Sequence, residues 1–211
     1  MILGEITTAA AESALIVMGG LHPSDNEATV ILLGTGPGFW SVFTAAPEYL
    51  DGAPDPLDRW SKRVIGAMAD AAGATTQYPS DGPPYPPFIA WALASGRFHT
   101  SPIGMMVHDT VGLMISLRGA ILLPARIELP PADFPHPCPD CDAPCTRACP
   151  VGALSAERAY DVAACHGYLD TAAGSDCMDN GCAARLACPL SAGAHRDPAQ
   201  SALHMKAFFR R

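Results

Sequence analysis

Residues 138–150 read Cys-Pro-Asp-Cys-Asp-Ala-Pro-Cys-Thr-Arg-Ala-Cys-Pro, a run of four cysteines with the spacing C-x2-C-x3-C-x3-C-P. Four further cysteines follow, and the last of them also precedes a proline, Pro189. The complete array is Cys138, Cys141, Cys145, Cys149, Cys165, Cys177, Cys182 and Cys188. Closely spaced cysteines that end in Cys-Pro are typical ligands of iron–sulfur clusters, and a distant cysteine often supplies the fourth ligand. The array therefore predicts a [4Fe–4S] domain, with two clusters preferred to one.

Zinc binding and disulfide bonding are the alternative uses of these cysteines. Disulfides are typical of secreted chains, but residues 1–20 have no basic segment and carry Glu5 ahead of the apolar stretch, unlike a signal peptide. Structural zinc usually binds two C-x2-C pairs, and only Cys138 and Cys141 have that spacing. Free thiols without a signal peptide predict a reducing, cytoplasmic location.

The composition predicts a soluble globular protein without nucleic-acid or membrane partners. Of the 211 residues, 49% are hydrophobic, a fraction that is ample for a core, and only 16% are charged. Thirteen basic residues against 21 acidic ones give a net charge of −8, the opposite of the basic surface that nucleic-acid binding requires. The sequence has no apolar run long enough to span a bilayer. It leaves the oligomeric state open.

A proline-rich stretch predicts the boundary between two domains. Residues 130–139 contain Pro130, Pro131, Pro135, Pro137 and Pro139, which is typical of a stiff linker. The chain should therefore consist of a body of residues 1–129 and a cluster domain of residues 130–211.

Helical and strand patterns alternate along the body. The clearest helix is predicted at residues 56–72, where apolar residues recur on one face, Pro56 occupies the first turn and Gly73 ends the pattern. Other helices are predicted at residues 7–18 and 88–95, and strands at residues 28–33, 74–78, 103–107 and 113–123. This alternation predicts an α+β fold, an α/β sandwich in which helices cover a sheet.

Three segments of the body are candidates for chemistry. Arg118 lies in an apolar strand pattern, where a buried guanidinium needs an anion; the alternative is a salt bridge to a nearby carboxylate. His108 precedes it, and a lone histidine is either structural or a ligand. The glycine-rich residues 34–38 either form a tight turn or allow a planar cofactor to approach closely. The proline-rich residues 83–88 either constrain the chain or form a wall for a flat or macrocyclic ligand.

Two segments resemble known families. Residues 108–124, with His108, Gly112 and Arg118-Gly-Ala-Ile-Leu-Leu-Pro in register, resemble the core of the cblC-type cobalamin-processing proteins. The cysteine run, its Cys-Pro-Val-Gly-Ala ending and Cys165-His-Gly-Tyr-Leu resemble epoxyqueuosine reductase and its ferredoxin-like relatives. The resemblance implies a nitroreductase-like or cobalamin-processing-like α+β body that holds cobalamin, followed by a small ferredoxin-like domain with two clusters.

The resemblance also implies roles for individual residues. His108, Gly112 and Arg118 would line the cofactor pocket, with Arg118 binding carboxylates. The implied ligands of one cluster are Cys138, Cys141, Cys145 and Cys188. Those of the other are Cys149, Cys165, Cys177 and Cys182.

This sequence departs from the reductase pattern in two places. Its last three cysteines follow C-x4-C-x5-C-P rather than C-x2-C-x3-C-P, a departure that concerns the ligands of the second cluster. The reductase's catalytic aspartate motif has no counterpart, so queuosine chemistry on tRNA is not expected.

We therefore expect an iron–sulfur redox protein that passes electrons to a cofactor or substrate in the body. The expected cofactor is a corrinoid, or FMN as second choice, which would make the chain a cobalamin- or flavin-linked reductase. The main alternative is a non-catalytic ferredoxin-like carrier that docks to a redox protein partner. A zinc-stabilised binding module is the third hypothesis.

Overall fold

The computed structural model describes residues 2–24, 27–132 and 134–210. It has a mixed α+β structure that divides into two compact units. The first unit comprises Met1–Phe98 and Ser116–Phe134, and the second comprises His99–Ile115 and Pro135–Arg211. This division differs from the single boundary expected between residues 129 and 130. The segment His99–Ile115, which we call the inserted hairpin, groups with the cysteines although it lies within the body in sequence.

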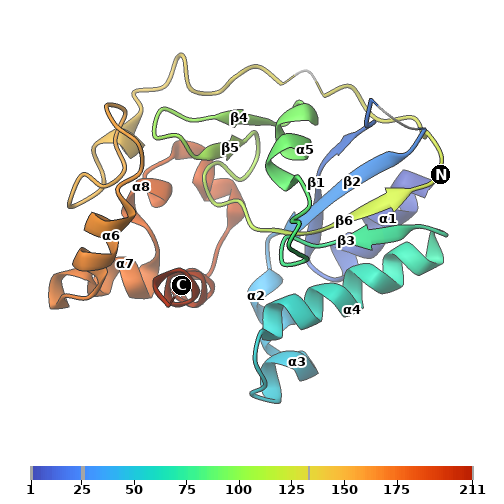
Figure 1. The fold of residues 1–211 in the computed structure, drawn as a ribbon, viewed down its shortest axis with the longest axis horizontal. Helices are drawn as coiled ribbons and strands as arrows, with labels where there is room; N and C mark the ends of the chain where they lie inside the picture. Colours follow the sequence, from blue (N-terminus) through green and yellow to red (C-terminus); the bar gives the residue numbers. More distant parts are fainter. Residues whose placement is uncertain (1, 25–26, 133, 211) are drawn as a thin grey trace. The chain divides into compact units, whose positions relative to one another are not determined.

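An antiparallel sheet forms the centre of the first unit (Figure 1). Its strands are β1 (Leu15–Leu21), β2 (Thr29–Thr35), β6 (Leu117–Leu123) and β3 (Thr75–Gln77), in the order β1-β2-β6-β3. β2 lies between β1 and β6 and is buried along its whole length. This position explains why its sequence is a continuous apolar run rather than an alternating pattern.

Helices pack on this sheet. α1 (Ile2–Glu12) contacts β1, α4 (Pro56–Ala71) contacts β6 and β3, and the two helices also contact each other. Figure 1 shows α4 running along the β3–β6 side of the sheet. Along the chain, α2 (Phe39–Thr44) and α3 (Pro47–Leu50) come between β2 and α4. The ring of Phe39 stacks on Phe43 at 5.5 Å between centroids and meets Trp60 edge-on at 5.2 Å.

Most of the predicted elements of the body are confirmed, but some are wrong over part of their length, and β6 begins at Leu117 rather than at residue 113. The helices predicted at residues 56–72 and 88–95 correspond to α4 and α5 (Phe88–Ala94). The helix predicted at residues 7–18 is wrong in its second half, because α1 ends at Glu12 and β1 begins at Leu15. Ala14 between them has a φ of 52°, which breaks the helix. The β-branched residues Ile16 and Val17 follow in an extended conformation, paired with β2.

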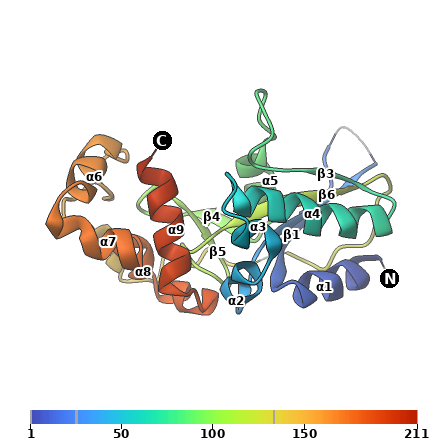
Figure 2. The same ribbon diagram turned by 90° about the horizontal axis from the view of Figure 1, so that it is seen from below.

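The second unit consists of short elements joined by loops. β4 (Phe98–Thr100) and β5 (Met106–His108) pair in the inserted hairpin. The strand predicted at residues 103–107 is wrong in its first part, because residues 103–105 form a turn and only Met106 and Val107 belong to β5. The helices are α6 (Val162–Leu169), α7 (Ser175–Asn180), α8 (Ala183–Leu186) and α9 (Pro198–Phe209). The 3-10 turns are η1 (Pro144–Thr146), η2 (Ala172–Gly174) and η3 (Pro189–Ala194). Figure 2 shows α9 lying alongside α7, which it contacts closely.

Membrane-spanning helices were sought in the described parts of the chain. None of the helices there combines the length and the apolar character needed to cross a bilayer.

Candidate functional site

Tight turns shape the loop that carries the first four cysteines. The carbonyl of Cys138 accepts the N–H of Cys141 at 3.1 Å, and the carbonyl of Cys149 accepts the N–H of Gly152 at 3.1 Å. Cys145 lies in η1, whose first residue is Pro144. Proline suits this position because the first N–H of a helical turn has no partner within the turn. The prolines of the run therefore fix the path of the loop.

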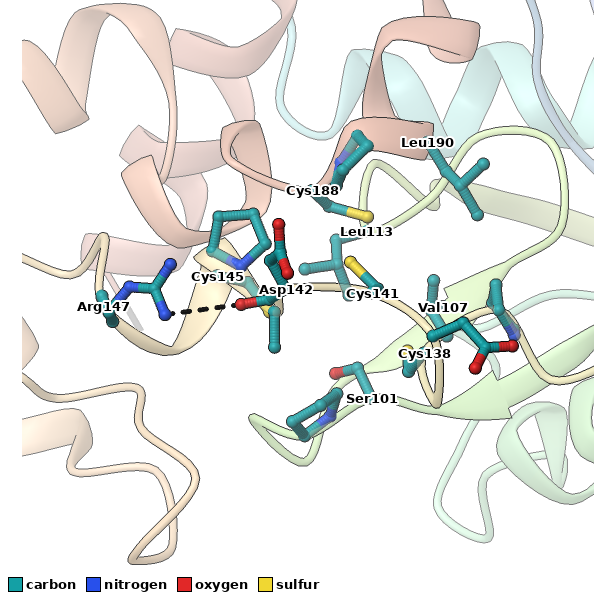
Figure 3. Close-up of a pocket in the computed structure, with 16 residues that line it drawn as sticks. Ser101, Val107, Leu113, Cys138, Cys141, Asp142, Cys145, Arg147, Cys188 and Leu190 are labelled. Carbon is teal, nitrogen blue, oxygen red and sulfur yellow. Dashed lines mark hydrogen bonds between the residues drawn. The ribbon is translucent and has the colours of Figure 1, made fainter.

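Four cysteines from two distant segments line a cavity of about 530 Å³. Cys138, Cys141 and Cys145 come from the first run, and Cys188 precedes η3 as its N-cap residue. We call these four cysteines the first set. Figure 3 shows them around one space, together with Ser101, Val107 and Leu113 of the inserted hairpin. Asp140, Asp142 and Arg147 also line this cavity.

The other four cysteines line a separate and much narrower cavity of about 20 Å³. They are Cys149, Cys165, Cys177 and Cys182, which we call the second set. Apolar and aromatic side chains such as Leu154, Tyr160 and Met205 complete the lining, which contains no charged residue among those described. The second set is therefore held in a less polar environment than the first.

Helical turns fill the wide spacing between the last three cysteines. The N–H of Gly181 bonds to the carbonyl of Cys177 at 3.1 Å and ends α7. Cys182 then acts as the N-cap of α8, and this one-turn helix lies between Cys182 and Cys188. The extra residues are thus accommodated in helices, while Cys177 and Cys182 still border the same cavity.

The thiol pKa values divide the cysteines in the same way. Burial raises the pKa of Cys138, and the neighbouring Cys145, Cys188 and Cys141 raise it further. In the second set, burial raises the pKa of Cys165, a side-chain hydrogen bond with Tyr160 lowers it, and Cys149 and Cys177 raise it by smaller amounts. The cysteine neighbours that shift these pKa values belong in each case to the same set.

An apolar cluster connects the two sets. The buried residues Leu154 and Ala184 belong to a cluster that also contains Cys145 of the first set. Cys138 and Cys188 of the first set pack against it, as do Cys149 and Cys182 of the second. The two candidate centres are therefore adjacent within the same unit.

The structure records all eight cysteines as free thiols. Among residues 2–24, 27–132 and 134–210, no group of three or more His, Cys, Asp or Glu side chains is placed to hold a metal ion. Such a group would have its donor atoms converging on one point. The thiols of each set instead border a cavity, and in a [4Fe–4S] cluster each of four thiolates bonds to a different iron.

Polar contacts fasten the inserted hairpin to the cysteine segment. Arg185 donates from Nε to the carbonyl of Leu113 at 2.6 Å and from Nη2 to the carbonyl of Ile115 at 2.9 Å. The Ser191 hydroxyl donates to the carbonyl of Arg185 at 2.7 Å and accepts the N–H of Leu113 at 3.1 Å. The hairpin is thus a structural part of the cysteine unit.

The three residues predicted to bind a body cofactor fall in different units. His108 and Gly112 lie in the inserted hairpin and bond to each other through their backbones, at 2.9 and 3.0 Å. His108 is fully buried, and its Nδ1 accepts the N–H of Thr110 at 3.2 Å. Arg118 lies in β6 of the first unit, where its Nη1 is 3.6 Å from Oδ1 of Asp58. The salt bridge considered for Arg118 is therefore present.

The two remaining candidate segments have structural explanations. The glycine-rich residues 34–38 form the turn from β2 to α2, with Gly38 at a φ of 77° as the N-cap residue. The proline-rich residues 83–88 form the loop before α5. Tyr85 in this loop is 67% exposed.

Sequence reasoning missed the inserted hairpin, Arg185 and Ser191. A signal for Arg185 was present, because it stands in the otherwise apolar stretch Ala-Ala-Arg-Leu-Ala between Cys182 and Cys188. The argument that singled out Arg118 applies equally there, since a buried guanidinium must find acceptors. No comparable signal marks Ser191.

A scan against models of protein families found no match, and neither did a search of curated proteins.

Proposed function

We propose that this chain is an electron-transfer protein in which each cysteine set binds one [4Fe–4S] cluster. The observation that carries the proposal is that each cavity is lined by cysteines from both the early run, residues 138–149, and the later cysteines, residues 165–188. Cys149 of the early run lines the second cavity, and Cys188 of the later cysteines lines the first. This exchange of the cysteine that precedes proline is the arrangement of two-cluster ferredoxins.

The donor chemistry also supports the proposal. Each cavity has four thiols, the full ligand set of a [4Fe–4S] cluster. The first cavity has ample room. The second is much narrower, so a cluster bound there would require the side chains that line it to move outward. When bound, the clusters would supply one-electron transfer, and the shared apolar residues would bring the two centres close together.

Iron and acid-labile sulfide, measured after anaerobic reconstitution, test this proposal. We expect about eight of each per chain, as two [4Fe–4S] clusters require. Zinc without sulfide would overturn the proposal in favour of a zinc-stabilised module. Cys188→Ser and Cys138→Ser should remove one and the same EPR signal, while Cys149→Ser and Cys177→Ser should remove the other. If Cys149→Ser and Cys138→Ser remove the same signal, the assignment of ligands by set is wrong.

We further propose, from the resemblance to nitroreductase-like and cobalamin-processing proteins, that the electrons pass to a cofactor held by the first unit. A corrinoid is the first choice and FMN the second. Titration of the reconstituted protein with cobalamin and with FMN tests this part separately. Absence of binding and of spectral change with both ligands would overturn it.

The placement of the predicted cofactor residues favours a second candidate, a ferredoxin-like carrier that serves a protein partner. His108 and Gly112 help to build the cysteine unit, and Arg118 has Asp58 as an ionic partner. A carrier would keep its cluster signals and its electron transfer to a partner when Arg118 is replaced by methionine. A reductase that uses Arg118 to hold its cofactor would lose cofactor binding.

A further inference from the structure

The hydroxyl of Ser101 is a buried polar group that lacks a hydrogen-bond partner among the described residues. Ser101 lies between β4 and β5 in the inserted hairpin and is only 5% exposed. Its backbone is fully engaged, because its N–H donates to Met105 and its carbonyl accepts from Gly104. A buried hydroxyl without a partner is unfavourable, so such a group calls for an explanation.

One other side-chain atom in the described residues shares this condition, Nε2 of His166. His166 has an aromatic neighbour, since its imidazole and the ring of Phe208 form a T-shaped pair with 4.7 Å between centroids. An imidazole N–H can interact with an aromatic ring, so this atom has a local explanation.

Ser101 borders the cavity of the first set (Figure 3). The neighbouring hairpin residues that line this cavity are Pro102, Val107 and Leu113, whose side chains carry no acceptor. The acidic residues Asp140 and Asp142 also line the cavity, but neither they nor the cysteines bond to the Ser101 hydroxyl, so a group bound in the cavity would supply its acceptor. The sulfur atoms of a cluster and of its thiolate ligands are acceptors of this kind.

We propose that the Ser101 hydroxyl donates a hydrogen bond to a sulfur of the cluster bound by the first set and thereby raises its reduction potential. The inference rests on the proposed iron–sulfur function. Reduction adds negative charge to the cluster, and a hydrogen-bond donor stabilises the more negative state more strongly. Ser101 is thus a residue that tunes the cluster, although it lies far from every cysteine in sequence.

The test is a redox titration of the reconstituted full-length chain, with dithionite as reductant and EPR as the readout. The signal of the first cluster is identified as the one that Cys188→Ser removes. Ser101→Ala should retain full iron and sulfide but shift the midpoint of that signal to a more negative potential. A tenfold change in the ratio of reduced to oxidised cluster corresponds to about 59 mV for a one-electron couple.

Two further variants separate tuning from packing. Ser101→Thr keeps the hydroxyl and should retain the wild-type potential. Ser95→Ala removes another buried hydroxyl, one that donates to the carbonyl of Ala92 at 2.7 Å, and should leave both potentials unchanged. In the metal-free protein, Ser101→Ala should not lower stability, because it removes an unpaired group, whereas Ser95→Ala should lower it.

The outcomes distinguish this inference from the function on which it rests. An unchanged midpoint in Ser101→Ala with full iron content overturns the role of Ser101 and leaves the cluster proposal standing. Equal shifts in Ser101→Ala and Ser101→Thr also overturn it, because they indicate a packing effect. A wild-type chain that binds neither iron nor sulfide overturns both.

Discussion

Gly112 provides a sharp test of how the inserted hairpin meets the cysteine segment. Its φ is 56°, in the left-handed region. A Cβ added there would lie 2.5 Å from the backbone nitrogen of Ser191 and 2.7 Å from the carbonyl carbon of Leu190. Both neighbours are backbone atoms, which cannot rotate away as a flexible side chain can. We therefore expect Gly112→Ala to push the hairpin away from residues 190–191.

The loss of stability expected for Gly112→Ala is the sum of two separate penalties. A non-glycine residue in the left-handed region costs roughly 1–2 kcal/mol. Overpacking a tight contact adds about 1–3 kcal/mol. Gly104 is a matched control in the same hairpin, because its φ is 75° and a Cβ there would have nothing within 4 Å. Gly104→Ala should therefore incur only the first penalty, and the difference between the two variants isolates the close contact.

The assay must report on the second unit. Trp40, Trp60 and Trp91 all lie in the first unit, so tryptophan fluorescence serves as an internal control that neither variant should change. Hydrogen exchange of residues 99–115, measured by mass spectrometry, reports the local loss of stability. Because residues 190–191 closely follow Cys188, Gly112→Ala should also reduce iron at the first set but not at the second. Equal effects of Gly112→Ala and Gly104→Ala would refute the reasoning.

Three further predictions concern charged side chains. Arg185→Ala removes the donors to two carbonyls of the inserted hairpin, and should lower the stability of the second unit by about 2–4 kcal/mol, measured by hydrogen exchange. The hydrogen bond from Arg63 holds the pKa of the Glu48 carboxyl below its ordinary value. The stability that it contributes is therefore present above the ordinary carboxyl pKa and lost as the pH falls through the lowered one. Glu48→Gln should flatten this dependence in tryptophan-monitored urea unfolding. Asp58→Asn should cost more than the roughly 1 kcal/mol of a fully exposed pair in the same assay, because the Arg118 side chain is only 14% exposed and loses the negative charge of its partner at 3.6 Å.

Local patterns in the sequence predicted those elements whose stability depends on local features. α4 was predictable because its apolar face, Pro56 and Gly73 all lie within one stretch. β2 was predictable because a strand buried throughout needs a continuous apolar run. The change from α1 to β1 was not predictable from local patterns. The alanine-rich start favours a helix, but the conformation of Ile16 and Val17 is decided by their pairing with β2.

In the candidate site, too, local sequence patterns predicted only part of the arrangement. The spacing of the cysteines and the resemblance to two-cluster proteins suggested the two sets, and each set lines its own cavity. The contribution of the inserted hairpin could not be predicted in this way. Neither Ser101 nor Gly112 carries a sequence signal that relates it to cysteines at least 26 positions away (Cys138 minus Gly112). Only the fold brings them beside the first cavity.

The exchange of Cys149 and Cys188 has a consequence for folding. Neither segment can complete a cavity by itself, because the first set needs Cys188 and the second needs Cys149. Arg185 and Ser191, which hold the inserted hairpin, lie between and just after the cysteines of the later segment. Metal sites of this kind gain folding free energy from ligand binding. Filling one set should therefore order segments that the other set also needs, which makes assembly of the two centres cooperative.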